Sequence, residues 1–354
     1  MKVCIVGDGL VSLSLAKAII NQGIKVDLIL DKNSKKINKF RTIGISKHNI
    51  DFFNNNILDI KKNLWKINQI EIYSDNLKSE KLLDFKRKKD PLFSIIQNYK
   101  LYNILFKSLN KSMLFKRKIN KSINFHENYN LVINCDPNNF ITKKYFSNKF
   151  FKDYFSFAYT TIIEHKKITN DTAVQIFTKQ GPLAFLPISN KKTSIVYSLR
   201  GEKKINLGDF IKTYNTKYSN IKINQVSHFK LSSMNLRNYH FKKILAFGEL
   251  LHKLHPLAGQ GFNMSIRDIK ILLDLIKKKI ELGIELDGSI CKDFEKKAKH
   301  KNFVFSQSID LIYELFNIES KTNNSLISKS AQFLGKKNYL KNFFSKYADI
   351  GIDI

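Results

Sequence analysis

The sequence is poor in the features that would place it in several large classes of protein. It contains no run of about 18 uncharged apolar residues, and Asp8 and Lys17 interrupt its apolar start, so we expect neither a membrane-spanning helix nor a secretory signal. The only cysteines are Cys4, Cys135 and Cys291, which lack the spacing of metal ligands. We therefore expect buried thiols, no metal site and a cytoplasmic location.

Acidic residues are also scarce, with 30 Asp and Glu against 61 Lys and Arg, which gives a formal net charge of +31. A basic surface attracts phosphates, which raises the hypothesis of nucleic-acid binding. However, only six of the basic residues are arginines, and the lysines are spread evenly rather than gathered in a stripe with aromatic residues. They are better interpreted as solvated surface, so no nucleic-acid partner is expected. The same charge would draw the protein toward anionic lipid head groups.

What is present begins with a compact unit in the first 31 residues. Residues 2–6 (KVCIV) predict a short buried strand, 10–22 a helix closed by Gly23, and 25–30 a second strand that ends at Asp31. With 354 residues of which 43% are hydrophobic, the chain can bury a large core, and we expect two closely packed domains.

The turn inside this unit fits a dinucleotide-binding fingerprint, with the sequence GDGLVS from Gly7. The first glycine allows the turn, Gly9 lets the backbone approach a pyrophosphate, and Ser12 stands where a small residue must fit between helix and sheet. Leu10 begins the helix, whose free N–H groups face the phosphates, and Asp31 can accept hydrogen bonds from ribose hydroxyls. The pattern predicts adenine dinucleotide binding; the alternative is a glycine turn in an ordinary α/β protein.

The middle of the chain changes character. Helices are predicted near 48–55 and at 98–109, with a strand near 69–73 between them. Residues 155–199 are rich in β-branched and aromatic residues and predict an antiparallel sheet. Beyond residue 282 the pattern is helical, and 294–316 is amphipathic.

The most informative stretch runs from Phe247 to Asn263 (FGELLHKLHPLAGQGFN), between a strand predicted at 244–247 and a helix predicted at 262–282. Gly259 and Gly261 would let this loop approach a flat ring closely, and the start of the helix would supply N–H donors. The stretch resembles the second flavin-binding motif of the class A flavoprotein monooxygenases, most closely the version found in ubiquinone-biosynthesis hydroxylases.

This resemblance implies FAD as cofactor and NAD(P)H as electron donor. In the family an acid before the loop contacts the ribityl chain, and Glu249 stands there in this sequence. His252 and His255 also match the motif, and we interpret both as capping or packing residues. The residues that the resemblance assigns to cofactor binding in the loop are Pro256, Ala258, Gly259, Gln260, Gly261, Phe262 and Asn263.

Two further segments extend the resemblance. Residues 41–46 (RTIGIS) are similar to the arginine segment of the family, which implies that Arg41 approaches a phosphate or the nicotinamide donor. Residues 181–187 (GPLAFLP) are similar to a strand that borders the substrate cavity, although a core strand is an equal reading.

The middle Asp-Gly motif of the family is altered. Asp136 is present and is expected near the cofactor, but Pro137 replaces the glycine, and no glycine occurs between Gly44 and Gly181. Proline fixes φ and lacks an N–H, so the loop must be reshaped. The segment 112–132 is also short for the family. We expect FAD binding to be retained despite these changes, and flavin reduction by NAD(P)H to be the step that they affect most.

These observations predict an α/β fold with a Rossmann-like FAD-binding domain (1–150 and 235–285), interleaved with an antiparallel substrate-domain sheet (151–234) and followed by a helical C-terminal region (286–354). The resemblance implies a monooxygenase that uses NAD(P)H and molecular oxygen to hydroxylate the ring of a polyprenyl phenol in ubiquinone biosynthesis. No catalytic side chain is assigned. The alternatives are a weakly or non-catalytic flavin-binding member of a quinone-biosynthesis complex and a plain NAD-dependent dehydrogenase. Peripheral attachment to the inner membrane face is a further hypothesis.

Overall fold

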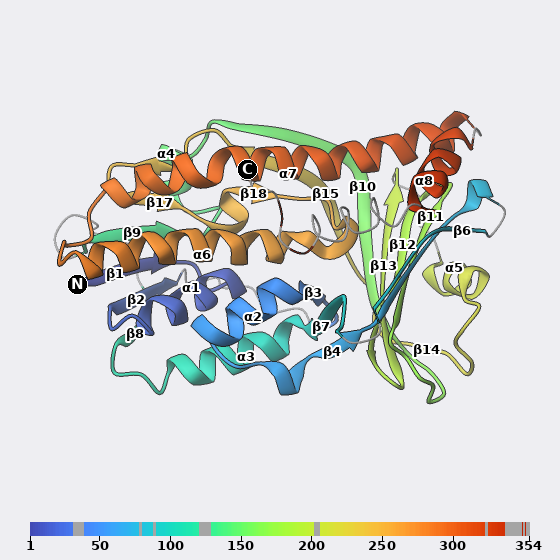
Figure 1. Ribbon diagram of the computed structural model, residues 1–354, viewed down its shortest axis with the longest axis horizontal. Coiled ribbons are helices and arrows are strands. Elements are labelled where there is room, and N and C mark those ends of the chain that lie inside the picture. Colours follow the sequence, from blue (N-terminus) through green and yellow to red (C-terminus); the bar gives the residue numbers. More distant parts are fainter. Residues whose placement is uncertain are drawn as a thin grey trace.

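The computed structural model describes residues 1–30, 39–77, 80–87, 90–119, 129–201, 206–322, 325–336, 349 and 351. The chain builds two main β-sheets, with a parallel sheet at the N-terminal end and a large, mostly antiparallel sheet at the other (Figure 1). Two long helices run between these ends. The predicted α/β fold class is confirmed.

The first sheet is the core of the dinucleotide-binding part. Its strands lie in the order β16-β17-β9-β1-β2-β8, and all neighbouring pairs are parallel except β16 with β17. Such strands are buried on both faces, which is why KVCIV reads as a continuous apolar run. The bounds are β1 Lys2–Val6, β2 Lys25–Leu30, β8 Phe115–Ile119, β9 Leu131–Asn134, β16 His240–Phe241 and β17 Ile244–Ala246.

Helices cover this sheet. Helix α1 (Leu10–Ile20) connects β1 to β2 and packs against α3 (Asn98–Leu109) and α6 (Gln260–Glu281). Helix α3 has the predicted bounds, whereas α6 begins two residues earlier than predicted. The short helix α4 (Phe140–Tyr145) follows β9.

The large sheet is built mainly from the middle of the chain, as the sequence predicts. Its order is β18-β15-β10-β13-β12-β11-β5-β6, with β14 paired to β10, and only the β5–β11 pair is parallel. Strands β5 and β6 come from the stretch 1–150 that the sequence analysis assigned to the FAD-binding domain, but they extend this sheet because β5 pairs with β11. The bounds are β5 Gln69–Ser74, β6 Lys81–Lys86, β10 Lys149–Glu164, β11 Thr172–Thr178, β12 Gly181–Ser189, β13 Lys192–Arg200, β14 Lys222–Ile223, β15 Ser227–Leu236 and β18 His252–Lys253.

A small third sheet joins the two main ones. It has the order β3-β7-β4, with bounds β3 Thr42–Ser46, β4 Trp65–Ile67 and β7 Phe93–Gln97, and α2 (Lys47–Asn56) follows β3 directly. Ile67 and Ile95 of this sheet form an apolar cluster with Ala173 of the large sheet. Strand β3 therefore lies where the two halves of the molecule meet.

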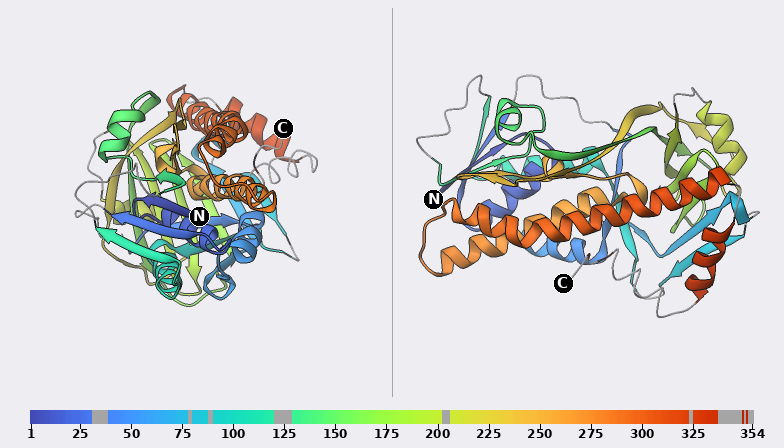
Figure 2. Two further views of the ribbon diagram at one scale, coloured as in Figure 1. Left: turned by 90° about the vertical axis from the view of Figure 1, so that its left-hand side faces the viewer. Right: turned by 90° about the horizontal axis from the view of Figure 1, so that it is seen from above.

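The C-terminal part is helical, as predicted. Helix α7 (Ser289–Thr322) lies beside α6 and continues to the large sheet, where α8 (Leu326–Lys336) packs against β6 (Figure 2). Helix α5 (Leu207–Tyr214) covers the opposite face of the large sheet. Among the described residues, no helix combines the length and apolar character needed to span a bilayer.

Candidate functional site

The turn after β1 can be made only with glycine at its first position. Gly7 has φ +106, and a Cβ there would lie 3.4 Å from the backbone N of Asp136. Its own N–H donates to the Ile29 carbonyl, which ties the turn to the end of β2. Gly9 differs, since its φ of −70 is open to other residues and a Cβ there would meet nothing within 4 Å. The reason for glycine at position 9 is therefore not contact within the protein.

The start of α1 has the features of an anion-binding helix N-terminus. Gly9 is the N-cap, so no side chain accepts from the first N–H groups, and the first turn, which begins at Leu10, holds no acidic residue. Such a terminus presents free donors and a partial positive charge. Ser12 is buried between helix and sheet, where a small residue is required. Asp31, the predicted ribose ligand, lies outside the described residues.

The loop with the altered Asp-Gly motif lies beside Gly7 and is closed by its own side chains. The Asp136 carboxylate accepts from the N–H of Asn138 at 2.8 Å, and Asn139 caps α4 by accepting from the N–H of Thr142 at 2.9 Å. The Thr142 hydroxyl donates to the Asp136 carbonyl at 2.6 Å. With Pro137 in place of glycine, side-chain oxygens thus organise this turn.

A second uncapped helix start occurs in the distal loop. Gly259 is the N-cap of α6 in the left-handed conformation (φ +61), which favours glycine, and a Cβ there would lie 3.9 Å from the backbone N of Gly44. A Cβ at Gly261 would meet nothing within 4 Å, and the first turn of α6 has no acidic residue. This loop therefore also offers N–H donors and a surface that can approach a flat ring.

Asn263 fixes this helix start to β3. Its side-chain amide donates to the Gly44 carbonyl, and its oxygen accepts from the Ser46 N–H and from the Asn49 side chain, each at 2.9 Å. The side chain is buried and its hydrogen-bonding capacity is used within the protein. Any contact of Asn263 with a cofactor must therefore come from its backbone.

The two histidines of the loop support it, as the sequence analysis predicted. The Nε2 of His252 lies 2.6 Å from one carboxylate oxygen of Asp268, and the other oxygen accepts from the side chain of Asn302. These buried contacts join β18 to α6 and α7. The Nδ1 of His255 accepts from the N–H of Leu257 at 3.1 Å and so caps the short turn that precedes Gly259.

The ring of His255 is held uncharged. It packs between Tyr154 and Tyr313, with ring centroids 4.9 and 4.2 Å away, and its Nε2 has no hydrogen-bond partner among the described residues. Burial, and secondly the positive charge of Arg200, lowers the pKa of His255 to about 3. The loop therefore carries no charge from this side chain at neutral pH.

Two further predicted residues, Glu249 and Arg41, are exposed. Gly248 has φ +65, and a Cβ there would lie 3.1 Å from Val11 of α1. Glu249 is the next residue and is exposed, so its backbone lies close to the first turn of α1. Arg41 is exposed where β3 meets the large sheet, with its guanidinium 5.1 Å from the Phe229 ring centroid.

The remaining loop positions have structural partners. The Pro256 carbonyl accepts from the Gly259 N–H, Gln260 accepts from Arg267 at 3.4 Å, and half-buried Phe262 packs against the main core. Ala258 contributes its backbone to the short 3₁₀ turn Leu257–Gly259.

The face of the large sheet turned toward β3 carries small side chains that the sequence analysis did not single out. The strand register sets Val196 opposite both Thr160 and Ala184. Ser194 of this face accepts from the hydroxyl of Thr42 at 3.0 Å, and the Thr160 hydroxyl is buried without a partner among the described residues. Only strand pairing brings these positions together, so no local signal could have found them.

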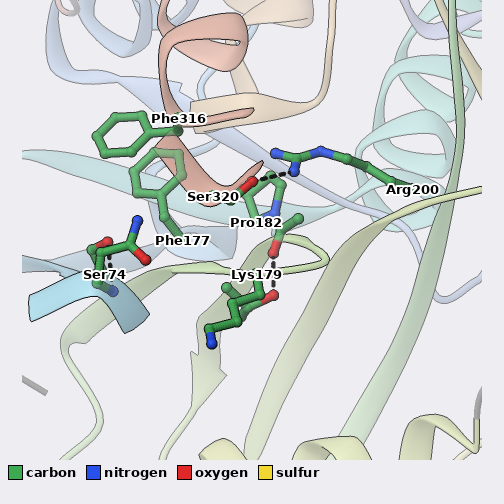
Figure 3. Close-up of a pocket in the computed structure, with 10 residues that line it drawn as sticks. Ser74, Phe177, Lys179, Pro182, Arg200, Phe316 and Ser320 are labelled. Atoms are coloured by element: carbon green, nitrogen blue, oxygen red, sulfur yellow. Dashed lines mark hydrogen bonds between the residues drawn. The ribbon is translucent and has the colours of Figure 1, made fainter. Parts of the chain in front are cut away.

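The segment 181–187 forms a core strand, β12, and one of its residues also borders a small cavity. Pro182 borders a small cavity with Phe177 and Phe316, whose rings stack, and Arg200 donates to Ser320 beside it at 2.7 Å (Figure 3). The alternate residue Leu183 points to the opposite face, into the core under α5. Elsewhere in the described part of the chain, no group of three or more potential metal ligands occurs.

Comparisons with known proteins agree with this geometry. A family model described as an FAD binding domain matches residues 210–281, which include the distal loop. The chain is 26% identical over 196 residues to the mitochondrial ubiquinone biosynthesis monooxygenase COQ6 of Dictyostelium discoideum, and 27% identical over 158 residues to the 3-demethoxyubiquinol 3-hydroxylase of Escherichia coli. The chain is therefore similar to FAD-dependent monooxygenases of ubiquinone biosynthesis, and its residues 210–281 match an FAD binding domain.

These two matches cover 44% and 42% of this chain, and only 39% and 40% of the relatives. COQ6 of Schizosaccharomyces pombe aligns over nearly the whole length, at 23% identity with 99% of this chain and 92% of the relative. That alignment spans 441 positions against 354 residues here, so the yeast protein has segments without a counterpart in this chain.

Solved structures of other proteins share the fold of this chain. HpxO of Klebsiella pneumoniae, complexed with FAD and uric acid, superimposes with a TM-score of 0.77 at 10% identity, covering 99% of this chain and 97% of that one. The p-nitrophenol 4-monooxygenase PnpA of Pseudomonas putida gives 0.76 at 11% identity, covering 99% and 98%. FAD is the cofactor, and the two uncapped helix starts with open space at Gly9 and Gly261 fit it.

Proposed function

We propose that the protein is a monooxygenase that hydroxylates the aromatic ring of a polyprenyl phenol in ubiquinone biosynthesis, with NAD(P)H as electron donor and molecular oxygen as co-substrate. One observation carries the proposal: α1 and α6 pack against each other, and each begins at a glycine N-cap without a side-chain acceptor. The names of the relatives supply the pathway.

The residues proposed to hold FAD fall into two groups. Backbone donors at Gly9, Leu10 and Ser12 would face the pyrophosphate, Gly7 would form the turn beneath it, and Asp31 and Glu249 would contact the sugar chains. The backbone of the loop 256–263 and the start of α6 approach the flavin ring, while Arg41 and Asp136 lie at the borders of the cofactor. When bound, FAD supplies the electron transfer and the activation of oxygen.

The protein itself contributes position and exclusion of water. We propose that the phenol ring binds on the face of the large sheet that carries Thr160, Ala184 and Val196, where β3 meets the sheet through Thr42. The unpartnered hydroxyl of Thr160 is a candidate donor to a phenolic oxygen on that face. His252 and Asp268 are buried, so this part of the loop excludes water.

The first test is on the purified protein. We expect an absorption band at roughly 450 nm from oxidised flavin, and NAD(P)H consumption that a short-chain phenol accelerates with appearance of a hydroxylated product. Absence of the flavin band would refute the cofactor assignment. Flavin reduction without any hydroxylated product would refute the monooxygenase activity.

A second test is in cells. An Escherichia coli strain without its 3-demethoxyubiquinol 3-hydroxylase should recover ubiquinone when it expresses this chain, if both act on the same ring position. Profiling of the quinone intermediates in the native host after deletion of the gene should reveal an accumulated phenol one oxygen short. Unchanged ubiquinone in the deletion strain argues against the proposal.

The closed loop at Pro137 favours a second candidate function. Because Asp136 already accepts from Asn138, this loop offers less free backbone to a nicotinamide donor. The chain would then be a flavin-binding, weakly catalytic member of a quinone-biosynthesis complex. Stopped-flow reduction by NADPH separates the two functions, since rapid bleaching of the flavin that a phenol accelerates excludes the accessory function. A cytoplasmic location with peripheral attachment to the inner membrane face is part of both proposals.

A further inference from the structure

The outer side of helix α7 carries exposed apolar residues that the core does not use. Phe303, Leu311, Leu315 and Ile318 are all exposed, with Leu311 at 60% and Ile318 at 53%. Their spacing of three, four or eight residues places them on one side of the helix. Phe150 of β10 extends this surface, because its ring centroid lies 5.8 Å from that of Phe303. We call these five residues the α7 outer face.

Lysines are the main exposed charged residues beside the α7 outer face. Every exposed charged position of α7 is a lysine, and no exposed position is acidic. Lys296 and Lys297 precede the apolar residues, and Lys321 follows them. One acid, Glu314, lies on the same side of the helix with its side chain 36% exposed, and it is paired with Lys152 at 2.9 Å. An apolar stripe flanked by lysines is the pattern of helices that lie in the interface of an anionic bilayer.

We propose that the α7 outer face docks on an anionic lipid surface, with its apolar side chains in the head-group region and its lysines on the lipid phosphates. A second copy of the chain fits this surface less well. Two such faces would bring lysines toward lysines, on molecules that each have a formal charge of +31. The same charge favours approach to anionic lipid.

The inner side of the same helix explains what docking would achieve. Phe305 and Ile309 of α7 form an apolar cluster with Leu257 and Met264 of the distal glycine loop and α6. A bilayer on the α7 outer face therefore lies about one helix diameter, roughly 10 Å, from the proposed flavin loop. A polyprenyl phenol is dissolved in the bilayer, so this orientation shortens its path to the site. This benefit rests on the proposed function, whereas the docking itself does not.

The test is co-sedimentation of the full chain with vesicles of phosphatidylcholine alone or with about a third phosphatidylglycerol. We expect binding to the anionic vesicles that weakens at high salt. The variant L311Q/L315Q/I318Q keeps good helix formers at these positions and should reduce the partition coefficient by about tenfold or more. The variant K296Q/K297Q/K321Q should reduce binding to the anionic vesicles by a similar factor.

The matched control is M113Q/L282Q, which removes two exposed apolar side chains, 97% and 72% exposed, outside α7. It should bind vesicles like the unaltered chain. Equal binding by the L311Q/L315Q/I318Q variant and the control would overturn the proposal. So would an oligomer of the unaltered chain that dissociates in the L311Q/L315Q/I318Q variant, because the face would then bind a second copy.

Flavin content and turnover of a short-chain phenol in solution are measured on the same samples. If the chain binds vesicles but holds no flavin, the docking of the α7 outer face on lipid is supported and the proposed function is refuted. If the chain holds flavin and is active but does not bind anionic vesicles, only the docking of the α7 outer face on lipid is refuted. In the variant, turnover of the soluble phenol should stay within about twofold, because Leu311, Leu315 and Ile318 do not line the site.

Discussion

Helices α1 and α6 begin alike but are supported differently. Each starts at a glycine N-cap without a side-chain acceptor and without an acid in its first turn. The start of α1 is held by backbone contacts within the parallel sheet, such as the bond from Gly7 to Ile29. The start of α6 is held by a buried side chain, Asn263, that reaches across to β3. The proposed phosphate site at α1 therefore depends on residues close together in the sequence, whereas the proposed flavin-ring site at α6 depends on residues far apart in it.

The largest effect should come from breaking the support of α6. Asn263→Ala leaves the Ser46 N–H and the Gly44 carbonyl buried without partners, so we expect a loss of about 3 kcal/mol in the free energy of unfolding. Urea unfolding of the flavin-free protein measures it. The matched control is Asn139→Ala near the first site, where loss of the cap of α4 should cost about 1 kcal/mol. Equal losses in the free energy of unfolding for the two variants would contradict the idea that the start of α6 depends more strongly on a side chain than the region of the first site does.

The next effect concerns pH. Burial lowers the pKa of His255 from 6.5 to about 3, so below pH 6.5 the unfolded chain binds a proton that the folded chain does not. The stability contributed by neutral His255 is complete above pH 6.5 and is lost as the pH falls toward 3. His255→Gln should therefore flatten the stability profile by up to about 1.4 kcal/mol per pH unit in this window. Parallel profiles of the two proteins in urea unfolding would contradict the burial of an uncharged ring.

A smaller effect is expected at the first site. Gly9→Ala adds a Cβ that meets nothing in the protein, so stability without flavin should change by less than about 1 kcal/mol. The methyl group would occupy the space proposed for the pyrophosphate, and FAD affinity should fall by about tenfold or more. Fluorescence titration of the flavin-free protein measures this change. Unaltered affinity would show that the backbone at Gly9 does not approach the cofactor.

The smallest effect is expected at Pro137. Because Asp136 and Asn139 close this turn through their side chains, Pro137→Ala should lower stability by less than about 1 kcal/mol and leave the flavin content unchanged. Pro137→Gly should likewise leave the rate of flavin reduction by NAD(P)H within about twofold. An increase of about tenfold or more would identify the proline itself, rather than the closed turn, as the obstacle to reduction.

Local patterns predicted most elements because each depends on neighbouring residues. The helix at 98–109 follows from its apolar spacing and has the predicted bounds, and the first βαβ unit follows from its glycine turn, although α1 ends at Ile20 rather than at residue 22. The start of α6 was placed two residues late, since Gly259 enters the helix in a left-handed conformation that periodicity does not reveal. The roles of His252 and His255 as packing and capping residues were also predictable, because a tight loop needs such partners.

The sequence by itself determined the two glycine motifs and the order of the main elements, because these depend on short-range backbone geometry and side-chain periodicity. The resemblance of the distal loop to a known flavin-binding motif implied FAD. Only the tertiary structure decided that β5 and β6 extend the large sheet, that the side chain of Asn263 is used to hold β3, and that small residues of separate strands share one face. The physical reason is that strand pairing and buried hydrogen bonds join residues far apart in the chain, and no local pattern records such a partner.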